Sequence, residues 1–348
     1  MDFLGLPGLL PLIQAPMAGS QGARLARAVG EAGALGSLPA AMLGADALER
    51  ELQLLQAAGR PYNVNFFTHQ PPAPDPARDA RWHKALAPYY AELGLALSQA
   101  TDGASRRPFG PESAEVLERF RPAVVSFHFG LPSPELLARV RAMGSRVMAS
   151  ATTLAEALWL QERRVDAVIA QGLEAGGHRG HFLSTDISLQ TGMLDLVAQC
   201  ALALRVPVIA AGGISDAASV RAAMAAGASA VQAGTAFLLC PEATTGPVHR
   251  TRLKDRDAQP TLTNLFSGGL ARGMSNRLMR ELGPVSDQAP AFPLASGALA
   301  PLRAQAEAEG RDDFTPLWSG TNRAGCRELP AAEIVRALAA GFSLPGRP

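Results

Sequence analysis

The chain has 348 residues, of which 47% are hydrophobic and 18% are charged, and its formal net charge is +1. Because there is no basic excess, we expect neither nucleic acid nor a membrane surface as a partner. The widely spaced cysteines predict neither a disulfide framework nor a zinc site, and the absence of a signal-peptide pattern or a long apolar run predicts a cytoplasmic protein.

Short apolar runs alternate with helical patterns along most of the chain, which is typical of repeated β-α units. We expect eight strands, the number that closes a (β/α)8 TIM barrel, and favour this α/β fold over an open doubly wound sheet. The expected strands cover residues 11–17, 34–38, 63–67, 123–129, 146–150, 167–171, 207–211 and 230–234. The expected helices between them cover residues 23–31, 45–58, 134–143, 154–163, 189–204 and 217–226.

Two stretches do not fit this repeat. Residues 68–111 are rich in proline and charge around an aromatic patch and are too long for an ordinary crossover, so they predict an insertion. Residues 240–326 carry helical patterns around 272–282 and 299–309 and predict a helical cap on the substrate side. The expected organisation is therefore a barrel over residues 1–239 with this insertion, then the cap, and then a C-terminal helix within 327–348 that returns to the barrel.

Histidines and glycines follow the predicted strands, where the active sites of such barrels lie. Gly176, Gly177 and His178 follow the sixth strand, and His128 ends the fourth. Imidazole suits proton transfer near neutral pH. His178 is the stronger catalytic candidate because its glycine-rich loop has little structural need for an imidazole, whereas a structural role for His128 is equally open.

The other histidines are expected to have minor roles. His181 is interpreted as a loop residue that pairs with Asp186, and His69, His83 and His249 are expected at the surface. His178 and His181 are three residues apart, but no third ligand is spaced with them, so we expect no metal site.

The last two strands end in residues suited to an anionic cofactor. Gly212 and Gly213 follow the seventh strand, and the run Gln232, Ala233, Gly234 and Thr235 ends the eighth. The loops after these strands are the usual phosphate site of the fold, although a plain tight turn would also explain the glycines. Together with Gly176 and Gly177, they predict a cofactor larger than a bare phosphate.

Further residues at the strand ends suit a heterocycle. The amides of Asn65, Gln171 and Gln232 offer donors and acceptors, and Met17 offers a soft surface for a flat ring. Core hydrogen bonding and core packing are the alternatives for these side chains. In the cap, Arg272 and Arg277 are candidates to pair with an anion or to begin a solvated helix, and residues 317–320 are expected to return the chain to the cofactor.

Taken together, these segments resemble the FMN-dependent nitronate monooxygenases, formerly called 2-nitropropane dioxygenases, of the class I type. The resemblance rests on residues 14–17, 63–67, 126–130, 171–180, 211–214 and 232–235. The Glu-Ala-Gly-Gly-His stretch is shared with FMN-type enoyl reductases. The Ser-Phe-His-Phe-Gly stretch, together with Arg179 and Gly180, favours the nitronate enzymes.

The resemblance implies an FMN site and a reaction. It implies that the FMN phosphate lies near Gly176, Gly213, Gly234 and Thr235, and that Met17, Asn65 and Gln171 contact the ring. It also implies that His178 is the active-site histidine, with His128 nearby. In that chemistry a nitronate such as propionate 3-nitronate gives an electron to FMN, and dioxygen takes part in releasing nitrite and a carbonyl compound. His178 would remove the α-proton of a neutral nitroalkane.

Two alternatives remain open from the sequence. One is an FMN-dependent, NAD(P)H-using reductase such as an enoyl reductase, which differs in its electron source. The other is a non-catalytic barrel that senses FMN or another phosphate ligand. A homodimer is compatible with all three readings.

Overall fold

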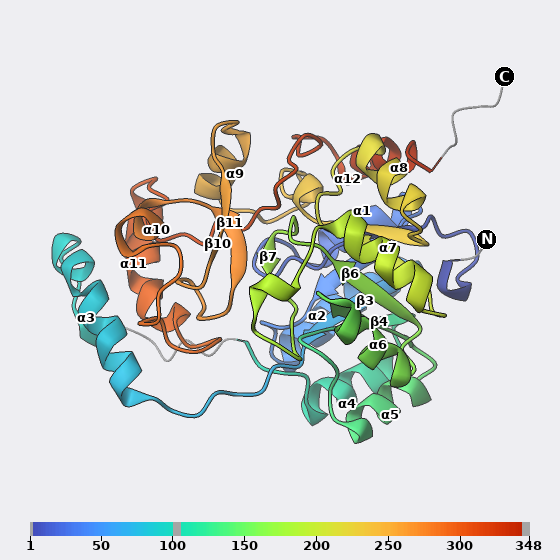
Figure 1. Cartoon of the computed structure of the whole chain (residues 1–348), viewed down its shortest axis with the longest axis horizontal. Coiled ribbons are helices and arrows are strands. Elements are labelled where there is room, and N and C mark those ends of the chain that lie inside the picture. The colour runs from blue at the N-terminus through green and yellow to red at the C-terminus, as the bar shows by residue number, and fades with distance from the viewer. Residues whose placement is uncertain (1–2, 100–105, 343–348) are drawn as a thin grey trace.

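A computed structural model describes residues 3–99 and 106–342 of the chain. Within these ranges eight parallel strands form one sheet in the order β1-β9-β8-β6-β5-β4-β3-β2, and a parallel bridge between Ile13 and Leu35 joins its two ends (Figure 1). The predicted (β/α)8 TIM barrel is confirmed. Its strands are β1 (Leu12–Gln14), β2 (Gly36–Pro39), β3 (Tyr62–Phe67), β4 (Val124–His128), β5 (Arg146–Ala151), β6 (Ala167–Gln171), β8 (Val208–Ala211) and β9 (Ala230–Ala233).

The described part of the chain surrounds this barrel with eight helices. They are α1 (Ala23–Glu31), α2 (Ala45–Ala57), α4 (Pro111–Phe120), α5 (Pro134–Ala142), α6 (Leu154–Glu162), α7 (Met193–Ala203), α8 (Ala217–Ala225) and α12 (Ala331–Ala339). α4 is not among the helices expected from the sequence, and its buried residues Ala114, Val116 and Leu117 lie among three glutamates. α12 lies in the expected C-terminal segment and packs against α1 and α8, so it completes the ring.

The barrel is packed at one end and open at the other. Its interior contains Ile13, Met148, Ile169 and Ile209, and a short N-terminal turn, η1 (Phe3–Gly5), packs beneath them with Phe3. This plug closes the end at which the strands begin. The loops that follow the strands are left at the opposite end, where a site can form.

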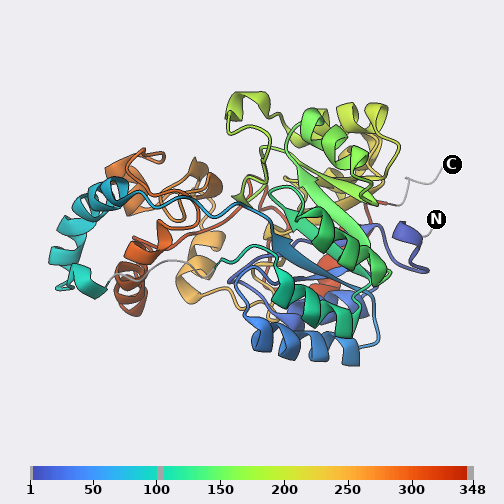
Figure 2. The same ribbon diagram turned by 90° about the horizontal axis from the view of Figure 1, so that it is seen from below.

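A smaller lobe beside the barrel is built from two distant parts of the sequence (Figures 1 and 2). Helix α3 (Pro76–Glu92), which belongs to the expected insertion, packs on α11 (Ser296–Ala308), which belongs to the expected cap. Trp82 and Tyr90 of α3 are buried and donate hydrogen bonds to the carbonyls of Ala295 and Ala298, at 3.3 and 2.6 Å. The two parts therefore share one hydrophobic core, and we call this lobe the cap. Residues 100–105 of the insertion, like 1–2 and 343–348, lie outside the described residues.

The cap also contains a small antiparallel sheet. Strand β10 (Pro260–Thr263) pairs with β11 (Ala271–Met274), which pairs with β7 (Gly177–His178) from the loop after β6. The expected helix at 272–282 is thus wrong in its first part, and α10 begins only at Arg277 (Arg277–Leu282). The physical reason is close packing at Gly273, where a Cβ would lie 2.9 Å from the carbonyl oxygen of Leu317.

Smaller differences concern the helix ends and the short turns. Helix α7 begins at Met193, after the 3-10 turn η3 (Ile187–Leu189), and not at the predicted residue 189. The remaining short elements are η2 (Leu97–Gln99), η4 (Thr235–Phe237) and α9 (Pro247–Lys254). No helix within the described ranges is both long enough and apolar enough to cross a bilayer.

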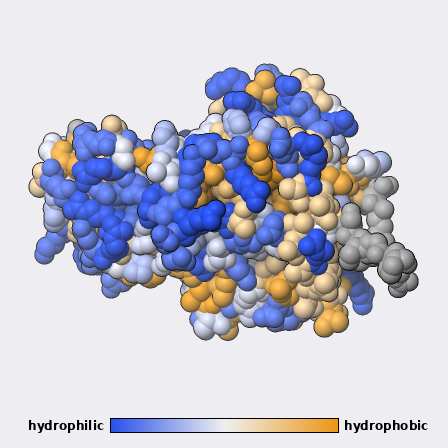
Figure 3. All heavy atoms as spheres, turned by 90° about the horizontal axis from the view of Figure 1, so that it is seen from above, coloured by the Kyte–Doolittle hydropathy of each residue, from blue (hydrophilic) through white to orange (hydrophobic). Residues whose placement is uncertain are grey.

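Figure 3 shows predominantly hydrophilic side chains over the cap. Ion pairs are part of this surface, since Arg277 of α10 binds Glu92 of α3 at 2.7 Å. Arg277 was a candidate to pair with an anionic ligand, but here a carboxylate of the protein occupies it.

We expect Gly36→Ala to destabilise the protein by about 3 kcal/mol or more, because overpacking against rigid backbone is costly. A Cβ on Gly36, the first residue of β2, would overlap the backbone carbonyl of Ala26 in α1. The matched control is Gly44→Ala, since a Cβ on Gly44 has no neighbour within 4 Å. Urea unfolding measures both variants, and equal stability of the two would contradict this account.

Candidate active site

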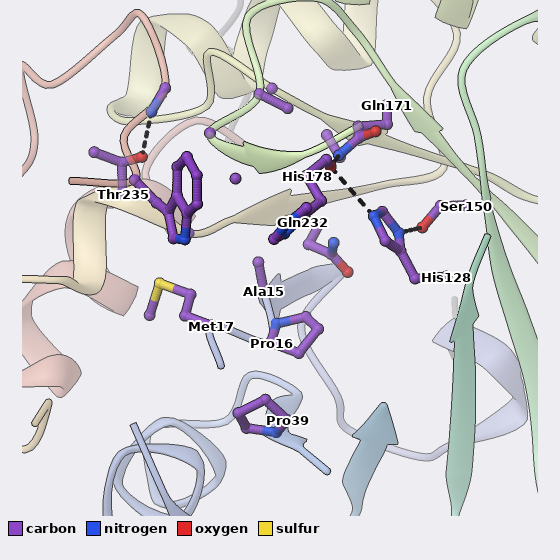
Figure 4. A pocket seen from close by; sticks show the side chains of 18 of the residues that line it. Ala15, Pro16, Met17, Pro39, His128, Ser150, Gln171, His178, Gln232 and Thr235 are labelled. Carbon is purple, nitrogen blue, oxygen red and sulfur yellow. Dashed lines mark hydrogen bonds between the residues drawn. The ribbon is translucent and has the colours of Figure 1, made fainter. Parts of the chain in front are cut away.

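A deep pocket opens at the carboxyl ends of the barrel strands, under the cap (Figure 4). The space between its walls, including the open mouth, is about 1290 Å³. The residues that line it come from the ends of all eight barrel strands and from residues 318–322, so the pocket extends over far more than a phosphate-sized site. Of the predicted site residues, the pocket brings together Met17, Asn65, His128, Gln171, Gly176, Gly177, His178, Gly212, Gly213, Gln232, Gly234 and Thr235. Ala233 lies behind this wall, where its carbonyl accepts a hydrogen bond from Ala15 N at 2.8 Å.

The loop after β6 is held by the side chain of Gln171. Its Nε2 donates to the carbonyl of His178 at 2.9 Å, and its Oε1 accepts from Gly180 N at 2.8 Å. The amide therefore satisfies backbone groups of the loop, which is the structural alternative considered for it. Gln171 still lines the pocket and fixes the position of the His178 backbone.

Arg179 also holds the loop after β6 in place. Its guanidinium is fully buried and donates to the carbonyls of Gly172 and Gln171, at 2.7 and 2.8 Å, and to Gln190 Oε1 at 2.9 Å. Burial lowers the pKa of Arg179 to about 10, so the group stays charged at neutral pH. The Arg179 guanidinium binds three acceptors of the protein, so it stabilises the loop and does not line the pocket.

His178 lies in β7, where the barrel meets the cap. Its Nε2 is 2.8 Å from Ser267 Oγ, and its ring lies against Phe292 and Trp318, with centroids 5.1 and 5.4 Å away. Burial, followed by the positive charge of Arg106, holds the pKa of His178 well below its usual value. The imidazole is therefore neutral at pH 7 and able to accept a proton.

His128 is engaged at both ring nitrogens. Because a carbonyl only accepts, Nε2–H donates to His178 O at 3.2 Å, and Nδ1 then accepts from the hydroxyl of Ser150 at 2.9 Å. These contacts are drawn in Figure 4. Burial lowers the pKa of His128 to about 4. This neutral tautomer ties β4 and β5 to the backbone of His178.

Glycine loops form the other side of the pocket. Gly212 and Gly213 have φ values of 110° and 70°, which favour glycine, and they turn the chain after β8. Asn322 Nδ2 donates to Gly213 O at 2.9 Å, and Gly320 N donates to Thr235 Oγ1 at 3.0 Å. The segment after residue 317 thus returns to the pocket, as the sequence predicted.

Amides line the floor between these two sides. Asn65 Nδ2 donates to the hydroxyl and the carbonyl oxygen of Ser126, at 3.0 and 3.2 Å. Gln232 Oε1 is buried without a hydrogen-bond partner among the described residues. A buried acceptor without a donor is costly, so Gln232 marks a position that a ligand N–H would complete.

Two histidines expected at the surface lie inside the protein. His249 is buried, and its Nε2–H donates to Trp318 O at 3.1 Å, which supports the aromatic wall of the pocket. His69 is half-buried, with its ring centroid 4.8 Å from that of Phe292. Their polar sequence surroundings gave no sign of this, because the cap covers both. His83 is exposed, as expected.

Two further predictions about single residues need correction or comment, and one residue of the pocket was not predicted. His181 contacts Gln190 at 3.4 Å, whereas Asp186 binds Ser188, so the predicted pairing of His181 with Asp186 is wrong. Arg272 donates through Nε to Leu173 O at 2.8 Å and is absent from the residues that line the pocket. Arg106 does line the pocket, and no sequence pattern pointed to it. Within residues 3–99 and 106–342, no cluster of His, Cys, Asp or Glu is placed to hold a metal ion.

The sequence matches a family model described as nitronate monooxygenase over residues 6–341. A nitronate monooxygenase from Pseudomonas aeruginosa is 42% identical over 342 residues, covering 94% of this chain and 95% of that protein. Another from Paraburkholderia phytofirmans is 40% identical, covering 94% and 91%.

Solved structures give a consistent comparison. The nitroalkane oxidase from Streptomyces ansochromogenes has a TM-score of 0.88 and 39% identity, covering 96% of this chain and 95% of that one. FabK from Thermotoga maritima has a TM-score of 0.67 and 24% identity, covering 96% and 92%. At that identity the likeness to FabK shows a common fold alone.

We expect the free energy of unfolding to fall as the pH drops from about 6.5 to about 5, because the unfolded chain then binds protons that the folded chain excludes. Burial lowers the pKa of His69, His128 and His249 to about 4 in the folded protein. Each contributes at most about 2 kcal/mol to this loss at pH 5, and the half-buried His69 contributes less because solvent screens it.

Urea unfolding at about pH 7 and about pH 5 measures the loss. His249→Asn should reduce the pH dependence, whereas His83→Asn, at an exposed position, should keep it. An unfolding free energy that stays constant over this range would contradict the expectation.

Proposed function

The chain belongs to the nitronate monooxygenase family, and we propose that it is a flavin-dependent enzyme that oxidises alkyl nitronates with dioxygen to a carbonyl compound and nitrite. The match over residues 6–341 carries this proposal. Supporting it, the pocket presents a neutral imidazole beside glycine loops and amides. Propionate 3-nitronate is the substrate type we assign. We expect the protein in the cytoplasm, and a homodimer is one candidate for its assembly.

Enzymes of this family depend on a flavin, and we assign FMN. The residues fit this group, because the orphaned Gln232 Oε1 suits a ring N–H and the loops at Gly213, Gly234 and Thr235 suit a phosphate. Gly176 would join them on the phosphate side, and Met17 and Asn65 would face the ring. When bound, FMN supplies the electron acceptor for the nitronate.

His178 is the proposed proton acceptor. Its Nδ1 has no hydrogen-bond partner in the part of the chain that the structure describes, whereas Nε2 is bonded to Ser267 Oγ. If Nε2–H donates to that hydroxyl, which in turn donates to Gly269 O at 3.4 Å, then Nδ1 carries the free lone pair. A neutral nitroalkane requires this base at its α-carbon, whereas a nitronate has already lost the proton.

We propose that His128 acts through His178 and not on the substrate. Both of its nitrogens are occupied, one by the backbone of His178 itself. Its tautomer is fixed by the carbonyl, so it orients the loop after β6 without exchanging protons.

The aromatic side chains around His178 would limit water. Phe67, Phe129, Phe292 and Trp318 surround its ring, with centroids between 5.1 and 6.3 Å away. In such surroundings electrostatic interactions are stronger than in water. A bound anion is then held firmly, and reactive intermediates are shielded from solvent.

The reaction class is tested on the purified, FMN-loaded protein. We expect oxygen uptake and nitrite release with propionate 3-nitronate, and slow bleaching of the flavin by NADPH without oxygen. Fast bleaching by NADPH with no nitronate-dependent oxygen uptake would favour the reductase alternative. A protein that cannot be reconstituted with FMN would overturn the flavin assignment and both enzyme readings.

We expect His178→Asn to retain FMN and to lower kcat/KM for neutral nitroethane by about 100-fold or more, the usual worth of a general base, with a loss below about tenfold for ethyl nitronate. The control is His83→Asn on the exposed face of α3. Steady-state oxygen uptake with each substrate measures the ratio. Equal losses on both substrates would remove the proton-acceptor role.

For the cofactor, we expect Gln232→Leu to raise the Kd of FMN about tenfold, the worth of one hydrogen bond in a buried site. Titration of the apoprotein by FMN fluorescence quenching measures it. Gln53→Leu, at an exposed position of α2, should leave the Kd unchanged. An unaltered Kd in Gln232→Leu would show that the cofactor does not complete this amide.

A further inference from the structure

Arg106 is a cation in the pocket that has no ion pair or hydrogen bond with any of the residues that the structure describes. It lies where the chain returns from the cap to the barrel, just before α4, and its side chain lines the cavity together with His178. Within the described ranges no carboxylate or carbonyl forms an ion pair or hydrogen bond with it. By contrast, Arg179 and Arg272 next to the pocket both bind backbone carbonyls.

The positive charge of Arg106 acts on His178, the proposed base. Arg106 and His178 line the same pocket, and the positive charge of Arg106 contributes to lowering the pKa of His178 and that of His69. The only other charge that acts strongly on Arg106 among the described residues is Arg303 of α11, which is also positive. Burial lowers the pKa of Arg106, but a guanidinium remains protonated in proteins at neutral pH.

A second polar group in the same region is unsatisfied. His69 Nδ1 is buried and has no hydrogen-bond partner in the described part of the chain. A partly buried cation without a counter-charge is less favourable than a paired one, and a buried ring nitrogen without a partner is destabilising. An anionic ligand would compensate for the charge of Arg106.

We propose that Arg106 binds the planar, two-oxygen anion of the substrate and is the specificity-determining cation of this pocket. Nitronate and carboxylate groups share this shape, which a guanidinium contacts through two parallel N–H donors. The choice of substrate rests on the proposed function, whereas the anion site does not. Lysine would supply the charge without the two-donor geometry.

The decisive variants are Arg106→Met and Arg106→Lys in the FMN-loaded enzyme. Arg107→Met is the matched control, because the neighbouring Arg107 is 80% exposed and lies 4.0 Å from Glu112. The substrates are ethyl nitronate, which has only the nitronate group, and propionate 3-nitronate, which has a carboxylate as well. Propionate is the unreactive probe, and its binding is followed by calorimetry.

We expect Arg106→Met to raise KM by about 30-fold or more, as expected for a lost charge-assisted hydrogen bond, with kcat within about threefold. Arg106→Lys should fall between Arg106→Met and the unaltered enzyme, and Arg107→Met should behave as the unaltered enzyme. A loss on both nitronates places the nitronate group on Arg106. A loss confined to propionate 3-nitronate, together with lost propionate binding, places the carboxylate there. Either result supports the proposal.

Two outcomes of these kinetic and binding measurements would overturn it. One is unchanged KM and unchanged propionate binding in a folded Arg106→Met. The other is a raised Kd for FMN with unaltered substrate KM, which would make Arg106 a cofactor residue. Should the unaltered enzyme not oxidise any nitronate, the proposed function fails, while propionate binding still tests the anion site.

A further measurement separates local charge from general disruption. In histidine-labelled protein followed by NMR, Arg106→Met should raise the pKa of His69 above its value of about 4, because one repulsive charge is gone. Arg107→Met should not change it. No rise in Arg106→Met would mean that the guanidinium is not beside these imidazoles and would overturn the proposal.

Discussion

The site depends on the hydrogen bonds that the buried guanidinium of Arg179 donates to the loop after β6. Parallel strands leave carbonyls at their carboxyl ends without ladder partners, and the last carbonyl of β6 and the one after it, Gln171 and Gly172, both bind Arg179. Removing a charge from water costs several kcal/mol, so it is tolerated only where acceptors surround it. Glu156 and Glu174 add favourable charge. The loop must therefore turn back over the barrel at this point, and that turn presents His178.

The same turn joins the barrel to the cap. β7 has only two residues, and it is ordered because it pairs with β11, whose Arg272 reaches back to Leu173. His178 is thus fixed by groups from both lobes: Gln171 and His128 of the barrel hold its backbone, and Ser267 of the cap holds its ring. The position of His178 therefore depends on the packing of the cap against the barrel. If His178 acts as the base we propose, changes in cap packing would change its activity as well.

The sequence predicts the barrel well because both faces of its sheet are buried, so its strands read as apolar runs, as at β6. Residues at strand ends such as Gln171 and Gln232 could be predicted to converge, because the topology brings them to one rim. The hairpin of β10 and β11 could not be predicted, since it is short, only half of its residues are buried, and Arg272 and Gly273 interrupt it. The shared core of the cap also depends on pairs such as Trp82 with Ala295, which are 213 positions apart.

Arg106 and His69 escaped prediction for the same reason, since their positions follow from cap packing and not from a local pattern. Burial by the cap has two linked electrostatic effects. It lowers the pKa of the histidines, because the charged imidazolium loses hydration, and it leaves Arg106 as a fixed positive charge beside them. In a site partly screened from water, a charge attracts an anion more strongly than it does in bulk water. One physical cause, burial, thus lowers the pKa of His178 and weakens the screening of the charge of Arg106, which is the basis for the roles we propose for both residues.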